Sequence, residues 1–65
     1  MLIRSIDTFL RRHAMPPTVF GRMAVNDPRL VFDLRRGRQP GETMQRRCRA
    51  FMVRVEKGEV SHHVG

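Results

Sequence analysis

The fold of this chain is decided by residues 27–37, DPRLVFDLRRG, which carry helix signals at both ends. Asp27 can accept backbone N–H bonds as an N-cap, and Pro28 suits the first helical position, where its missing N–H costs nothing. Gly37 can adopt the left-handed conformation that commonly ends a helix. The stretch therefore predicts a nine-residue helix over residues 28–36.

The two faces of this predicted helix differ in chemistry. Leu30, Val31 and Leu34 fall on one side at helical spacing and predict a buried face. The opposite side carries a mixture of polar, basic and aromatic residues, namely Pro28, Arg29, Phe32, Asp33 and Arg36. A short helix with a basic outer face and one exposed aromatic ring suggests insertion into a DNA groove.

The length and the cysteine content limit the architecture. Sixty-five residues allow one domain with a small core, so oligomerisation is a reasonable expectation. Cys48 is the only cysteine and has no partner for a disulfide within the chain. The longest apolar run covers residues 50–53, far short of a membrane span, and no secretory segment is recognised. We therefore expect a cytoplasmic protein without a membrane partner.

The charge balance points to a polyanionic partner. Thirteen basic residues, all arginine except Lys57, face six acidic ones and give a net charge of +7. The planar guanidinium fork can bind phosphate or guanine with two hydrogen bonds, which lysine cannot do. A solvated basic surface is the alternative explanation of the same composition.

Three further helices are predicted around the opening stretch. Residues 2–13 and 17–24 carry apolar side chains at helical spacing, and another helix begins at Glu42 and can end at Gly58. Gly21 inside the second helix costs about 1 kcal/mol relative to alanine, which suggests close approach of a neighbouring helix. The expected fold is all-α, a compact bundle of four helices, with a domain over residues 1–58 and a flexible tail over 59–65.

Residues 17–36 have the outline of a helix-turn-helix and resemble the lambda-repressor-like family of phage and bacterial transcriptional regulators (the Xre/Cro class). The resemblance covers roughly residues 2–57 and needs no gap from Phe20 to Gly37. It is carried by Phe20-Gly21 in place of the usual Leu-Ala pair, Asp27 as the cap, apolar Val31 and Leu34, and the segment Gly37-Arg38-Gln39-Pro40.

Two positions depart from the family pattern. Val25 stands in the turn where the family usually has glycine, and a β-branched residue tolerates positive φ poorly. Asn26 enters the left-handed region more easily and is the candidate to replace that glycine. Pro28 removes a donor where many relatives place a base-reading glutamine, so we expect readout to shift to Arg29.

The resemblance implies a DNA-binding transcriptional regulator, usually a homodimer, that places residues 28–36 in the major groove. We expect a repressor of an inverted repeat in double-stranded DNA, without a small-molecule ligand. Candidate base-contacting residues are Pro28, Arg29, Phe32 and Asp33. Candidate phosphate-contacting residues are Pro17, Thr18, Arg36 and Arg38. Asp33 lies four residues after Arg29, where it can orient the guanidinium.

Other classes of function stay open from the sequence. Phe32 can instead be a core or dimer-contact residue, and the same fold can serve as a protein-interaction module such as an antitoxin or adaptor. The arginine excess alone also fits nonspecific nucleic-acid binding. Cys48, His62 and His63 have no recognised metal spacing, and no nucleophile is paired with a base, so neither a metal, a cofactor nor an enzyme is expected.

Overall fold

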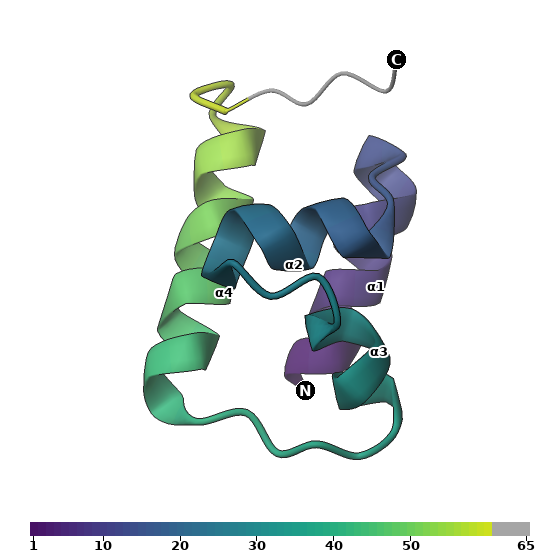
Figure 1. Ribbon diagram of the computed structural model, residues 1–65. Coiled ribbons are helices and arrows are strands. Elements are labelled where there is room, and N and C mark those ends of the chain that lie inside the picture. The colour runs from purple at the N-terminus through teal and green to yellow at the C-terminus, as the bar shows by residue number, and fades with distance from the viewer. Residues whose placement is uncertain (61–65) are drawn as a thin grey trace.

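The computed structural model describes residues 1–60, which form helices and no strand. The helices are α1 (Leu2–His13), α2 (Pro17–Val25), α3 (Leu30–Arg35) and α4 (Glu42–Glu56). Figure 1 shows α1 and α4 running in the same direction, with α2 crossing both and α3 lying below α2. The predicted all-α bundle of four helices is confirmed. None of the helices within residues 1–60 has the length and apolar character needed to cross a membrane.

Aromatic rings join three of the helices. Phe9 from α1, Phe20 from α2 and Phe51 from α4 meet edge to face, with centroid distances of 5.7 Å, 6.4 Å and 5.4 Å. Edge-to-face pairs at such distances add about 0.5–1.5 kcal/mol each beyond the area they bury. Phe20 is fully buried, as expected for a ring between α1 and α4.

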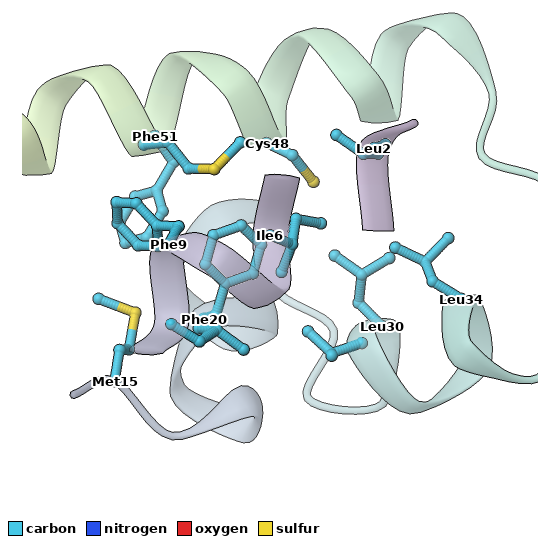
Figure 2. Packing of buried hydrophobic residues seen from close by; sticks show 12 residues of the cluster. Leu2, Ile6, Phe9, Met15, Phe20, Leu30, Leu34, Cys48 and Phe51 are labelled. Carbon is cyan, nitrogen blue, oxygen red and sulfur yellow. The ribbon is translucent and has the colours of Figure 1, made fainter. Parts of the chain in front are cut away.

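The other end of the core is aliphatic and holds α3. Leu30, Val31 and Leu34 are buried, as their spacing predicts, and belong to the same apolar cluster as Leu2 and Ile6 of α1. Figure 2 shows Leu30 and Leu34 beside Leu2, and the three phenylalanines at the opposite end of the cluster. Burying a side chain of this size stabilises the fold by roughly 1.5–3 kcal/mol.

The predicted bounds of the third helix are wrong at both ends. The α-helix covers Leu30–Arg35, six residues, and residues 28–29 form a turn before it. Asp27 nevertheless acts as the expected cap, since its Oδ1 accepts the N–H of Arg29 at 3.0 Å. The N–H of Leu30 bonds the Asp27 carbonyl oxygen at 3.1 Å, three residues back, so the first turn is tighter than an α-helix.

A residue with positive φ follows each of the four helices within residues 1–60. These residues are Ala14 (φ 51°), Asn26 (φ 58°), Gly37 (φ 106°) and Gly58 (φ 78°). After α3, the N–H of Gly37 bonds the Leu34 carbonyl at 3.1 Å and that of Arg38 bonds the Asp33 carbonyl at 3.0 Å. This is the Schellman closure of a helix end, and it bends the chain at Gly37.

The described chain continues two residues beyond Gly58. The N–H of Glu59 bonds the Arg54 carbonyl at 2.9 Å, and Val60 is partly buried against the core. The predicted flexible tail, residues 59–65, lies outside the described residues from position 61 onward.

Candidate nucleic-acid interface

The turn between α2 and α3 depends on one glycine. A Cβ on Gly21 would overlap the Asp27 carbonyl oxygen and would lie 3.2 Å from Leu30 Cβ. The Gly21 carbonyl in turn accepts the N–H of Asp27 at 2.9 Å. The close approach predicted from Gly21 is therefore confirmed, and its partner is the backbone of the turn together with the start of α3.

Asn26 takes the left-handed position of this turn. Its φ is 58°, its N–H bonds the Arg22 carbonyl at 3.0 Å, and α2 extends through Val25, one residue beyond its predicted end. The prediction that Asn26 adopts the left-handed conformation in this turn is confirmed. The left-handed conformation costs asparagine less free energy than most other non-glycine residues, because its short polar side chain can hydrogen-bond locally.

The outer face of α3 gathers most of the predicted base-contacting residues. Arg29, Phe32, Asp33 and Arg36 line one shallow open hollow. Phe32 is 41% exposed, so it is not a core residue of this chain. The guanidinium groups of Arg29 and Arg36 make no hydrogen bond or ion pair with other side chains within residues 1–60. Two free cations thus flank an exposed ring.

Arg38 neutralises the acids that border this face. Its Nη1 lies 3.3 Å from Asp27 Oδ2 and 3.4 Å from Asp33 Oδ2. The ion pair of Asp33 is therefore with Arg38, and not with Arg29 as the i, i+4 spacing predicted. Since the closure at Gly37 turns the chain back, Arg38 is brought alongside both carboxylates. The guanidinium of Arg29 therefore has no ion pair within residues 1–60.

Arg35 ties α3 to α1. Its Nη2 lies 2.7 Å from Asp7 Oδ1, and its guanidinium carbon lies 5.9 Å from the centroid of Phe32. The pair is partly exposed and is expected to contribute less than about 1 kcal/mol to stability. The ion pair with Asp7 holds the Arg35 guanidinium beside the ring of Phe32.

The remaining predicted contact residues lie around this face rather than on it. Pro28 is exposed in the turn before α3. Pro17 is the first residue of α2, and it borders a hollow that Asp7 and Arg35 also line. Thr18 follows it, exposed, at the same helix end. Pro17 is thus brought near the C-terminal end of α3.

The sequence left the neighbours of three contributors to this surface undefined, namely Arg35, Arg38 and Arg47. The Asp7–Arg35 pair spans 28 residues and leaves no local pattern to detect. Arg38 pairs with two carboxylates because of the turn at Gly37. The sequence predicted this turn but not the ion pairs that it allows. Arg47 of α4 borders a hollow with Asp27 and Arg38, which adds one arginine of the last helix to the same side.

The titratable side chains outside this surface include one cysteine, Cys48, on α4. Residues 1–60 contain no cluster of three histidine, cysteine, aspartate or glutamate side chains able to hold an ion. Cys48 is fully buried in the core. Burial raises the pKa of its thiol, and the nearby charge of Arg49 lowers it only in part. A buried neutral thiol behaves as a small apolar side chain.

The chain was compared with known proteins at three levels. No protein-family model, no curated protein and no solved structure matches it.

Proposed function

We propose that this chain is a sequence-specific DNA-binding transcriptional regulator that presents the outer face of α3 to the major groove of duplex DNA. The observation that carries the proposal is the hollow that Arg29, Phe32, Asp33 and Arg36 line along α3, a helix whose start packs closely against Gly21. Arginine can bind guanine O6 and N7 together, and an exposed ring can cover a thymine methyl.

The proposed roles follow from position. Arg29 lies at the start of α3 and is the base-reading residue, and Phe32 is one turn further along. Arg36 and the N-terminus of α2 at Pro17 and Thr18 contact phosphates, which fix the orientation on the duplex. Arg38 keeps this surface positively charged, chiefly because its guanidinium neutralises the carboxylates of Asp27 and Asp33.

We further propose a homodimer that represses transcription from an inverted repeat. A domain of 65 residues reads few base pairs, so two copies on half-sites about 34 Å apart supply the required specificity. A protein acting on the chromosome in this way belongs to the bacterial cytoplasm, associated with the nucleoid.

In-vitro selection from random duplexes tests the proposal. We expect a two-fold symmetric consensus, and an affinity that falls steeply between about 50 and 200 mM salt as counterions are released. Equal affinity for the consensus and for scrambled duplexes would indicate nonspecific nucleic-acid binding instead. Absence of duplex binding, with tight protein binding through Phe32, would indicate an interaction module.

Two arginine variants separate base reading from phosphate contact. Arg29→Ala should relax the preference at one base position, a loss of about 1–3 kcal/mol of discrimination. Arg36→Ala removes the same charge from the opposite end of α3 and should weaken all duplexes alike. Fluorescence anisotropy with the consensus and its single-base variants measures both. An unchanged base preference in Arg29→Ala contradicts the assigned readout.

A further inference from the structure

A second surface lies between α1 and α4, because residues of both helices line one open hollow. We call it the α1/α4 groove. All the residues that line it belong to these two helices, and none comes from α2 or α3. It therefore shares no residue with the hollow on α3, and a partner bound here leaves the DNA-binding face accessible.

The floor of the α1/α4 groove is apolar. Phe9 and Met52 form it, and Val53 beside them is 50% exposed. Val53 is one of the four large hydrophobic residues of the described chain that stay exposed, and it is the one that lies in this groove. Covering such a side chain stabilises a complex by roughly 25 cal/mol for each Å² removed from water.

The rim of the α1/α4 groove is cationic. Arg4 and Arg49 line it and make no ion pair with any residue in the described range 1–60. At its far end Arg12 Nη1 lies 3.3 Å from Glu56 Oε2, and both side chains are about half exposed. The lining of the groove thus includes three arginines and one glutamate, and that glutamate is already paired.

The charge and the apolar area of the α1/α4 groove together indicate which class of molecule it binds. A second copy docked through this groove would place one arginine rim against another, and this like-charge contact opposes association at this particular surface. A nucleic-acid backbone would pair with the arginines and leave Val53 and the floor in water. An acidic polypeptide with an apolar side chain satisfies both the rim and the floor.

We propose that the α1/α4 groove docks an acidic segment of a protein partner. The carboxylates of the segment lie on Arg4 and Arg49, and an apolar side chain of the segment covers Val53 and Met52. This interaction is separate from DNA binding and does not require it, so the chain can hold a partner and a duplex at the same time.

Peptide selection tests the proposal without a known partner. The probe is a library of random linear peptides displayed on phage and selected against the immobilised full chain. We expect enrichment of acidic peptides with at least one large apolar residue. The affinity of a synthetic peptide of the enriched sequence should fall about tenfold or more, equivalent to about 1.4 kcal/mol, in both Arg49→Glu and Arg4→Glu.

Two further variants define the outcome. Val53→Ser should also weaken the peptide, and its effect should persist in high salt, because it removes an apolar contact. Arg36→Glu is the matched charge reversal, directly after the end of α3, and should leave peptide affinity unchanged. Circular dichroism confirms that each exposed-site variant is folded before its affinity is measured.

Several results would overturn the proposal. Enrichment without acidic residues would refute the role of the arginines, and equal loss in Arg36→Glu and Arg49→Glu would show only general attraction to a basic protein. Sedimentation that shows self-association abolished by Arg49→Glu would assign the groove to a second copy. Displacement of the peptide by a duplex, with no effect of Val53→Ser, would assign it to nucleic acid.

Discussion

Gly21 sets how closely α2 approaches the turn that leads into α3. Gly21→Ala places a methyl group on the Asp27 carbonyl oxygen, which is backbone and cannot rotate away. We expect a loss of about 1–3 kcal/mol in the free energy of unfolding, or more if the turn is displaced. Urea denaturation followed by circular dichroism measures this loss.

The matched control for that substitution is Gly41→Ala. A Cβ at Gly41 meets no atom within 4 Å, and its φ of −71° is ordinary for alanine. The change in unfolding free energy should stay below about 1 kcal/mol, since only the cap preference and chain entropy are altered. Equal losses in the two variants would show that close approach at Gly21 is not the cause.

Arg38 offers a prediction on charge rather than packing. Arg38→Gln leaves Asp27 and Asp33 unneutralised beside the proposed DNA face, so affinity should fall for every duplex alike. Adding Asp33→Asn to Arg38→Gln should restore part of that affinity. Anisotropy titrations with the consensus and a scrambled duplex test this, and a change confined to one base position would speak against it.

At the scale of elements, α3 is attached to α1 by a core contact and a surface contact. The core contact is made by Leu30, Val31 and Leu34, and the surface contact is the Asp7–Arg35 pair. The first holds the helix in place, whereas the second fixes Arg35 close to Phe32. The two contacts therefore predict different consequences when they are removed.

Asp7→Asn should separate affinity from selectivity. Arg35 loses its carboxylate and becomes available to phosphates, so we expect tighter binding to all duplexes and a weaker preference at the base beneath Phe32. The unfolding free energy should change by less than about 1 kcal/mol. Glu56→Gln frees Arg12 at the far helix ends and changes net charge equally, so it should leave the base preference intact.

The elements were largely predictable from the sequence, because their signals are local. Prolines at the start of α2, the apolar stripe of α4 and the left-handed Asn26 all act within a few residues. The length of α3 was not predictable, because Pro28 permits either a helical or a tighter first turn. The partner of Asp33 was not predictable either, since the spacing to Arg29 looks favourable and Arg38 reaches it only after the chain reverses at Gly37.

At the scale of the whole molecule, the ionisation of Cys48 makes the stability of the fold depend on pH. Burial raises the pKa of its thiol above the ordinary value near 9.0. The folded chain then holds this proton more tightly than the unfolded chain, so the stabilisation is complete below the unfolded pKa and is lost as pH rises through the folded one. The unfolding free energy should fall above about pH 9.

The variant Cys48→Ala isolates this effect. It costs stability at every pH because it leaves a small cavity, but its unfolding free energy should decline less steeply above about pH 9. Urea midpoints measured for both chains on either side of that pH give the comparison. Parallel pH profiles would show that another group causes the decline.

The six-residue length of α3 ties recognition to folding. A helix this short is not stable as an isolated peptide, because its few hydrogen bonds do not offset the free-energy cost of nucleation. The outer face of α3 therefore exists only while Leu30, Val31 and Leu34 are docked. Any ligand of that face selects the folded chain and raises its melting temperature by mass action. Conversely, a destabilising core variant that does not contact the ligand lowers the fraction of folded chains, and with it the fraction of chains that bind ligand. Loss of binding alone therefore does not identify a residue that contacts the ligand.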